Sequence, residues 1–269
     1  MRSAFSRTLR AMPTLLRVGV AETVAYRAEF LVWMLTSTMP LIMLALWTSV
    51  AAEAPFQDFT SADFVAYYLA VLIVRNLTGN WVAWQIAEEV RMGILSMRLL
   101  RPIHPFIAYA VLHISAVPFR SMIALPLCVI LLLSSGASAL TTEPLQIALL
   151  LPSILLAWLI TFGIMFALGG TAFWITQNFG IVNFYFGLWS LLSGYLLPLA
   201  LLPQALRTIA KWLPFHAMLG APVELMMRHL SSAQVAELIG RQVAWAVASI
   251  LIGLAVWRAG VRRFEAVGG

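Results

Sequence analysis

Apolar residues are gathered into six long runs along the chain, and the stretches between the runs hold most of the charged residues. The runs cover about residues 30–50, 64–87, 106–133, 147–175, 184–202 and 235–257. A helix needs roughly 20 apolar residues to cross a hydrocarbon core of about 30 Å, and each run comes close to or exceeds that length. The pattern therefore predicts an all-α integral membrane protein with six transmembrane helices.

The six predicted spans divide the chain into an amphipathic helix at 1–28, a transmembrane domain at 29–258 and a cytosolic tail at 259–269. In the first part, apolar residues recur at steps of three and four, while Arg7, Arg10 and Arg17 share another face. We expect Pro13 to kink or restart this helix. The pattern is typical of a helix at the lipid interface. It is equally compatible with an interface helix that also touches a cytoplasmic partner.

The first span could instead be read as a signal peptide, because Ala52-Glu53-Ala54 has the small-x-small form of a cleavage site. About 29 residues precede an apolar run of roughly 20 residues, whereas a signal peptide has a short basic start and an apolar region of about 7 to 15 residues. We expect the first helix to be retained.

Composition supports the membrane interpretation. The chain is 62% hydrophobic and 10% charged, with a mean hydropathy of +0.91. Soluble domains are roughly one-half apolar and one-quarter charged. The single cysteine, Cys128, excludes an intrachain disulfide and a multi-cysteine zinc site. Little length is left for a soluble catalytic domain.

The chain has a net charge of +6, and its basic residues are distributed unequally between the two predicted sides of the membrane. Of the 17 basic residues, 11 fall on the side of the termini, three on the opposite side and three within spans. The positive-inside rule therefore predicts cytoplasmic termini. Because the basic residues cluster beside the ends of apolar runs, we expect lipid headgroups, and not nucleic acid, to be their partners.

The longest predicted inner loop, residues 86–105, is also the most charged stretch after the N-terminus. Glu88 and Arg91 form an i,i+3 pair, apolar residues recur at helical spacing from Val90, and Pro102 helps to end the element. We predict a short cytosolic helix lying across the inner surface, which would be the main contact for a cytosolic partner.

Helix breakers alternate with apolar turns in the long segment before the last span. The prolines are Pro198, Pro203, Pro214 and Pro222. An ordinary polar loop would not hold so many apolar residues between them. We predict a re-entrant segment on the outer side, because broken backbone at membrane depth requires surrounding protein or a cavity.

Of the three basic residues within predicted spans, two are candidates for a functional site: Arg75 in the second span and Arg120 in the third. An intramembrane charge is costly and marks a candidate functional site. Arg75 and Asn76 belong to a polar stripe that could form a buried hydrogen-bond network between helices or line a substrate path, and both interpretations also apply to Arg120. Small residues in the fourth span, including Gly163 and Gly170, predict close approach of helix backbones.

The motifs of nucleotide-binding and hydrolytic enzymes are absent from the sequence. The only lysine, Lys211, follows Ala210, so the chain has no phosphate-binding loop of the form G-x-x-x-x-G-K-[ST]. It has neither H-E-x-x-H nor G-x-S-x-G, and its four histidines lack metal-ligand spacing. We predict no catalytic residue, no metal site and no cofactor in this chain.

These features together resemble the type-2 (ABC-2) exporter permeases. The segment Glu88-Glu89-Val90-Arg91-Met92-Gly93, followed by Leu99-Leu100-Arg101-Pro102-Ile103-His104-Pro105, is similar to the subgroup encoded beside a second permease and a separate ATPase. The run from Ser193-Gly194-Tyr195 through Pro198, Pro203 and Pro214 is similar to the fifth helix and outer re-entrant helices of that family.

The resemblance implies a half-permease in a bacterial inner membrane. Two such subunits, identical or paired with a paralogue, would sit on two cytosolic ATPase subunits that bind ATP and Mg. Residues 88–102 would form the coupling helix, flanked by the N-terminal helix. The residues expected to contact the ATPase are Glu88, Glu89, Arg91, Gly93, Ile94, Leu95, Arg101 and Pro102.

The main alternative is a secondary transporter or channel that works without ATP. That class favours proton-relay residues within spans and an inverted repeat, whereas all eleven acidic residues lie at or near predicted span ends or in loops. A membrane enzyme is a weaker alternative, because no catalytic constellation is present. The sequence does not identify the substrate.

Overall fold

The computed structural model describes residues 4–25, 39–53, 59–135, 137–175, 177–227 and 230–264. In these ranges every secondary-structure element is an α-helix or a short 3-10 helix, as the sequence predicts. The α-helices are α1 (Ala4–Ala25), α3 (Met39–Glu53), α4 (Ser61–Thr78), α5 (Val82–Arg91), α6 (Leu95–Leu99), α7 (Pro105–Ser115), α8 (Val117–Ser135), α9 (Pro144–Gly170), α10 (Phe179–Leu192), α11 (Gln204–Trp212), α12 (Pro214–Met218), α13 (Gly220–Met227) and α14 (Ser232–Val261). Short 3-10 turns are η1 (Ala137–Ala139), η2 (Thr171–Phe173) and η3 (Leu199–Leu201).

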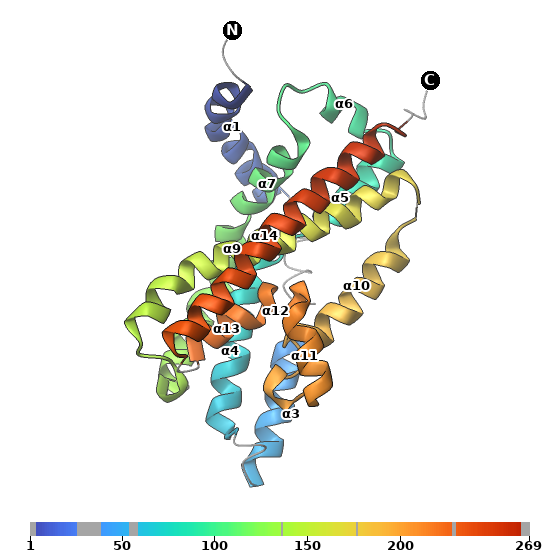
Figure 1. Ribbon diagram of the computed structural model, residues 1–269. Helices are drawn as coiled ribbons and strands as arrows, with labels where there is room; N and C mark the ends of the chain where they lie inside the picture. Colours follow the sequence, from blue (N-terminus) through green and yellow to red (C-terminus); the bar gives the residue numbers. More distant parts are fainter. Residues whose placement is uncertain are drawn as a thin grey trace.

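The long helices α9 and α14 run side by side in the same direction and form the centre of the molecule (Figure 1). Helix α4 packs against α9 and also against α3 and α8. The start of α1, helix α6 and the end of α14 lie at one end of the molecule, which we call the α6 end (Figure 1). The start of α4 lies at the opposite end, here the α3 end.

Helices α9 and α14 cross where both carry glycine. A Cβ atom at Gly163 would lie 2.8 Å from Ser249 Oγ and 2.9 Å from the Ser249 carbonyl carbon. A Cβ at Gly253 would lie 3.0 Å from the Gly163 carbonyl oxygen. The close backbone approach predicted from the small residues of this span is therefore confirmed.

A buried amide fixes the same pair of helices to α12. Gln242 of α14 is fully buried, and its Nε2 donates to the carbonyl oxygens of Ser153 (3.2 Å) and Ala217 (2.9 Å). Its Oε1 accepts from Ser153 Oγ at 2.8 Å. Because every polar atom of this amide is satisfied, its burial holds α12 in place instead of destabilising the core.

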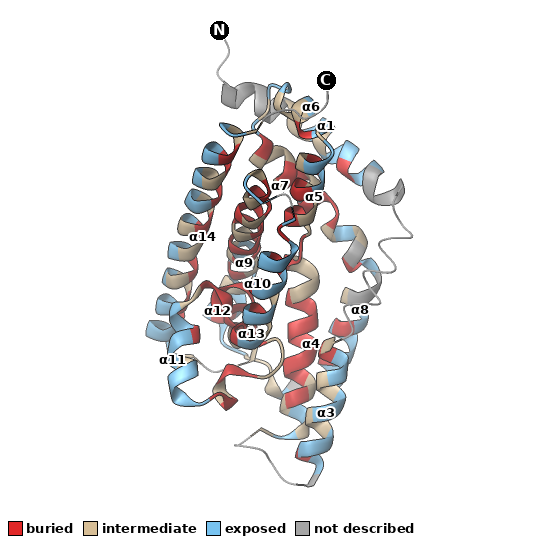
Figure 2. Cartoon of the chain, turned by 90° about the vertical axis from the view of Figure 1, so that its right-hand side faces the viewer, coloured by how far each residue is buried: buried red, intermediate tan, exposed pale blue. Residues whose placement is uncertain are grey.

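Among the described residues, two helices are long and apolar enough to cross a membrane, judged by length and composition: residues 144–173 and 232–261. Shorter apolar helices include Met39–Ala52, Pro105–Phe119, Leu125–Ser135 and Phe179–Leu192. Buried residues are concentrated in α4, α9 and α12, whereas α3, α11 and α14 have exposed outer faces (Figure 2). On α14 the exposed face includes Val247, Leu251 and Ile252, which are 50–61% exposed. Large apolar side chains on outer faces are what lipid-facing helices present.

Three of the predicted spans are broken. The second consists of α4 and α5, separated at 79–81, and the third consists of α7 and α8, separated at Ala116. Pro118 explains the break at Ala116 in the third span, because its ring would collide with the carbonyl group of Ile114 in a continuous helix. The fifth span begins at Phe179 and ends at Leu192, earlier than predicted, and Gly194 then turns the chain with φ +92°. Glycine adopts this backbone conformation without steric cost.

Helix α1 continues through Pro13 from Ala4 to Ala25, so the helix does not restart at this proline. Residues 26–38, which include the start of the predicted first span, lie outside the described residues.

Candidate functional site

The segment predicted to be one coupling helix is a helix, a turn and a second short helix. Helix α5 ends at Arg91, Gly93 turns the chain with φ +73°, and α6 runs from Leu95 to Leu99. Ser96 Oγ donates to the Gly93 carbonyl oxygen at 2.8 Å, which supports the turn. The glycine is required here because other residues rarely adopt a positive φ.

Glu89 lies inside this turn and accepts four hydrogen bonds. Arg98 donates from Nε (2.7 Å) and Nη2 (2.6 Å), the Tyr109 hydroxyl donates at 2.6 Å and Gln85 Nε2 at 3.1 Å. The guanidinium of Arg98 also lies 4.2 Å from the centre of the Tyr109 ring. The Glu89 side chain is 11% exposed. This carboxylate therefore joins α5, α6 and α7, and it is not available to pair with a partner protein as the sequence-based hypothesis assumed.

The network continues into the helical bundle through two further side chains. His113 of α7 is fully buried, and its Nε2 lies 3.1 Å from Gln85 Oε1. The centres of its ring and of the Trp81 ring lie 4.6 Å apart with the ring planes at 72°, and Trp81 is the last residue of the break in the second predicted span. The contacts thus connect the turn at the α6 end to the break between α4 and α5. Sequence reasoning missed Arg98 and Tyr109, because their link to Glu89 crosses 9 and 20 residues.

The outer surface of this turn is apolar and exposed. The exposed fractions are 57% for Met92, 52% for Ile94, 65% for Met97 and 80% for Leu100. We call these four residues the apolar tip. Among the predicted contact residues, Glu88, Arg91, Arg101 and Pro102 are also exposed. Leu95, predicted as part of the apolar anchor, is fully buried instead.

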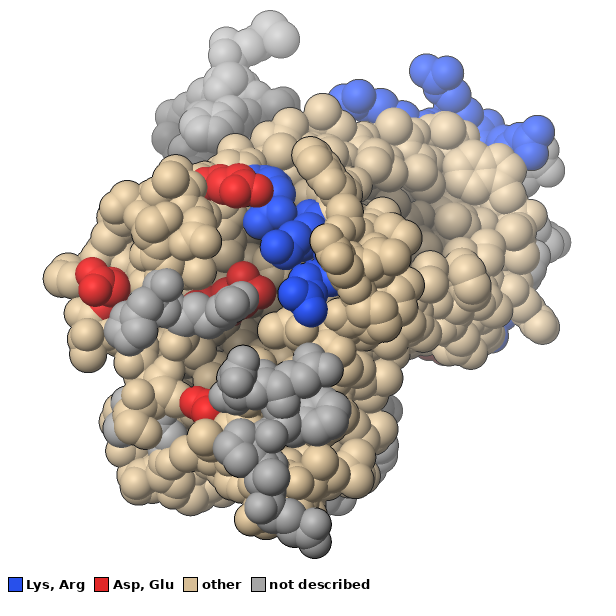
Figure 3. All heavy atoms as spheres, turned by 60° about the horizontal axis from the view of Figure 1, so that its bottom comes forward, with Lys and Arg blue, Asp and Glu red and all other residues tan. Residues whose placement is uncertain are grey.

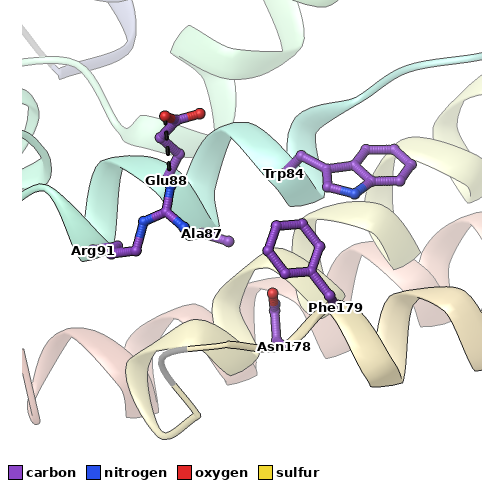
Figure 4. A pocket seen from close by; sticks show the side chains of 6 residues that line it. All are labelled: Trp84, Ala87, Glu88, Arg91, Asn178 and Phe179. Atoms are coloured by element: carbon purple, nitrogen blue, oxygen red, sulfur yellow. Dashed lines mark ion pairs between the residues drawn. The ribbon is translucent and has the colours of Figure 1, made fainter.

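A cavity of about 130 Å³ lies beside the turn, between α5 and the start of α10. Trp84 and Phe179 face each other across it, and the ion pair of Glu88 and Arg91, 3.6 Å apart, lies at its edge (Figure 4). The connection between the fourth and fifth predicted spans, which contains Asn178 and Phe179, is therefore in contact with the predicted inner loop 86–105. Asn178 anchors that loop, because its Nδ2 donates to the Leu168 carbonyl oxygen at 2.8 Å and to Thr171 Oγ1 at 3.0 Å.

His104 ends the turn and begins α7. Its Nδ1 accepts a hydrogen bond from the Phe106 backbone N–H at 3.2 Å. Burial and the nearby Arg258 lower the pKa of His104. A lowered pKa favours the neutral imidazole, which is the form that can accept this bond.

Helix α1 packs on α7 at the α6 end. Gly19 faces Ser115 so closely that a Cβ there would overlap the Ser115 hydroxyl. Arg17 is exposed, while the side chains of Arg7 and Arg10 lie outside the described residues. Helix α1 therefore contacts α7, the helix whose Tyr109 is hydrogen-bonded to Glu89.

The residues predicted to line a substrate path have different surroundings in the structure. Asn76 Nδ2 donates to the Leu72 carbonyl oxygen of its own helix at 2.9 Å, so it forms no bond between helices. Arg75 lies against α10, with its guanidinium 5.0 Å from the centre of the Trp189 ring. The side chain of Arg120 lies outside the described residues.

The proline-rich segment before the last predicted span packs into the bundle. Pro198 and Pro203 precede η3 and α11, Pro214 is the first residue of α12, and Pro222 lies within α13. Proline suits helix starts because its missing N–H would be unpaired there in any case. Pro214 and Pro222 are buried, as are most residues of α12.

One acidic residue of this segment is deeper than the sequence suggests. Glu224 Oε1 lies 3.3 Å from Nε2 of His216, which is 3% exposed. Helix α13, which carries Glu224, packs on α4 and α9. The sequence gives no signal for this pair, since Glu224 falls in a stretch that hydropathy reads as a loop.

Charges at the α3 end are compensated locally. Basic and acidic side chains lie near one another on this face (Figure 3). Arg207 donates to the carbonyl oxygens of Ala200 and Leu202, and Arg241 pairs with Glu237 at 3.6 Å. These residues stabilise their own segments, so they do not mark a ligand site.

Comparison with known proteins agrees with this architecture. A search of curated proteins found no match. Residues 31–268 match the sequence profile of a family described as ABC-2 family transporter protein. The match covers the whole helical bundle from the first predicted span onward, including the turn around Glu89 and the proline-rich outer segment. The chain therefore belongs to the ABC-2 family of transporter membrane proteins.

Proposed function

We propose that this chain is the membrane subunit of an ABC-2 type exporter, that two permease subunits form the substrate path, and that a separate cytosolic ATPase drives it through residues 88–102. Family membership supports a permease of an ABC-type transporter in general. The observation that carries the finer proposal is the apolar tip, an exposed apolar surface held in place by the buried Glu89 network.

Physical reasons favour this surface as the docking site. Contiguous exposed apolar residues indicate an interaction surface. Charged residues at its border, Arg91 and Arg101, can pair with carboxylates of a partner and set its orientation. Because hydrogen bonds join Glu89 to Arg98 and to Tyr109 of α7, the turn cannot move without α7. A force that a partner applies to the tip would therefore be transmitted to the helical bundle. The second permease is either a copy of this chain or a paralogue.

We expect Leu100→Glu to reduce co-purification of the ATPase at least tenfold. Leu100 is 80% exposed and makes no contribution to the core, so the substitution should leave the bundle folded while placing a charge in an apolar contact. The measurement is the amount of ATPase recovered with a tagged permease. Glu143→Arg, at the start of α9 at the α3 end, is the matched control and should recover a normal amount. Equal recovery for both variants would refute docking at the tip.

Reporter fusions test the topology. Six spans with both termini in the cytoplasm predict opposite sides for a reporter at Gly269 and one inserted near Glu143. The expectation follows from the distribution of basic residues, 11 on the terminal side and three on the other. Reporters active on the same side would contradict the six-span arrangement.

A further inference from the structure

Arg75 lies deep within the second span. It is 14 residues from the start of α4 at Ser61, about 21 Å along the helix. Its side chain is partly exposed, but Nε is buried and has no hydrogen-bond partner. The guanidinium rests 5.0 Å from the Trp189 ring centre and interacts with the hydroxyl of Tyr195.

The two polar residues that follow Arg75 on α4 do not bond to it. Asn76 and Thr78 each donate to a carbonyl oxygen of α4 four residues earlier, at 2.9 Å. Their polar atoms therefore belong to their own helix. A buried network between helices, one of the two interpretations of this stripe, is not what these two residues form.

No carboxylate of the described residues pairs with Arg75. The ion pairs in the described ranges join Glu88 to Arg91, Glu89 to Arg98, Glu224 to His216 and Glu237 to Arg241. Asp63 accepts hydrogen bonds from Thr60 at the start of α4. An arginine at membrane depth ordinarily has a partner, since an uncompensated charge there is costly. The missing anion must come from outside this part of the chain.

The surroundings of Arg75 are fixed by two tyrosines of its own helix. The Tyr67 hydroxyl donates to the Gly194 carbonyl oxygen at 2.6 Å, and the Tyr68 hydroxyl to that of Leu196 at 2.7 Å. These bonds hold the turn after α10, which places the Tyr195 ring 4.8 Å from the Trp189 ring. The result is a cation beside a wall of aromatic rings.

We propose that Arg75 binds the anionic group, phosphate or carboxylate, of an amphipathic molecule whose apolar part lies along Trp189 and α10. The aromatic wall supplies apolar contact and the partly exposed guanidinium a charged donor, so the site suits an anion attached to a hydrocarbon chain better than a free ion. The inference rests on the proposed function, because it treats α4 and α10 as part of the substrate path. The amphiphile can be a membrane lipid or an exported compound.

The test measures binding to the purified, tagged chain by native mass spectrometry. The probes are dodecyl phosphate, dodecyltrimethylammonium and dioleoylphosphatidylglycerol. We expect the wild type to bind both anions and to prefer dodecyl phosphate over the cationic amphiphile of equal chain length. Arg75→Gln should weaken anion binding roughly 10- to 100-fold, as for loss of one charge-assisted hydrogen bond. Tighter binding of dioleoylphosphatidylglycerol than of dodecyl phosphate assigns the site to a lipid, and the reverse order assigns it to a single-chain compound.

Two controls make the result decisive. Arg241→Gln removes an equal charge from an exposed ion pair and should keep wild-type affinity. Arg75→Lys retains the cation and should retain the preference for dodecyl phosphate, which tests the idea even if the glutamine variant does not fold. A wild-type chain without preference for anions would overturn the proposal, including the case in which a carboxylate of the second permease already occupies Arg75. ATPase recovery with the tagged chain reports the proposed function separately, because these binding measurements need no ATPase.

Discussion

Glu89→Gln is expected to lower the free energy of unfolding by about 3 kcal/mol or more. The substitution keeps the size of the side chain but leaves Arg98, whose side chain is 19% exposed, without its counter-charge. Breaking a buried ion pair from one side typically costs about 3–5 kcal/mol. The Tyr109 hydroxyl also loses a charged acceptor. Thermal unfolding in detergent measures the stability loss, and ATPase recovery with the tagged chain measures the effect on coupling.

The neighbouring residue is the matched control. Glu88 pairs with Arg91 at 3.6 Å, and both side chains are largely exposed, at 56% and 44%. Exposed pairs contribute about 0 to 1 kcal/mol, so Glu88→Gln should hardly change the unfolding temperature. The double variant Glu89→Met, Arg98→Met should be more stable than Glu89→Gln alone, because it removes both charges. Similar unfolding temperatures for Glu88→Gln and Glu89→Gln would show that the network does not hold the turn.

The same glycine-to-alanine change is expected to have opposite effects at two positions. At Gly163 the added Cβ would lie 2.8–3.0 Å from side-chain and backbone atoms of Ser249, so α9 and α14 must separate. Overpacking of this kind costs about 1–3 kcal/mol. At Gly187, within α10, no atom lies within 4 Å of the added Cβ. There alanine should stabilise the helix by about 0.5–1 kcal/mol through its lower backbone entropy in the unfolded chain.

Unfolding temperatures of Gly163→Ala and Gly187→Ala in the same detergent provide the comparison. A decrease for the first and an unchanged or higher value for the second is the expected result. If both variants unfold at the wild-type temperature, the crossing of α9 and α14 is looser than the structure indicates.

Hydropathy predicted where helices lie better than where they break. The sixth predicted span, 235–257, falls within one helical stretch, 232–261, and the fourth, 147–175, matches the stretch 144–173 to within three residues at each end. The second span breaks at 79–81, where Gly79 adopts an extended backbone conformation with φ −61° and ψ 145°. Hydropathy averaged over about 20 residues does not detect such a local change of conformation. Pro118 was visible as a breaker, but its effect depends on where the preceding helix ends.

The sequence predicted helical structure in the segment around Glu89, but not the contacts that its residues make. The sequence shows Glu88 and Arg91 as an i,i+3 pair, and this pair forms. It does not show that Gly93 folds α6 back so that Arg98 reaches Glu89. The contact between Glu89 and Arg98 depends on tertiary structure. The only signal for it in the sequence is a glycine, Gly93, between a glutamate and an arginine that are nine residues apart.

The packing of α5 on α9 has a mechanical consequence. A Cβ at Gly169 would lie 3.0 Å from Ala83 Cα and from Ile86 Cβ, so no space separates the two helices. Helix α5 cannot tilt without carrying α9 and, through the Gly163 crossing, α14. If a partner pushes on the tip, we expect the backbone between Thr78 and Val82 to act as a hinge, so that α5, about 15 Å long, turns together with the central helices relative to α4.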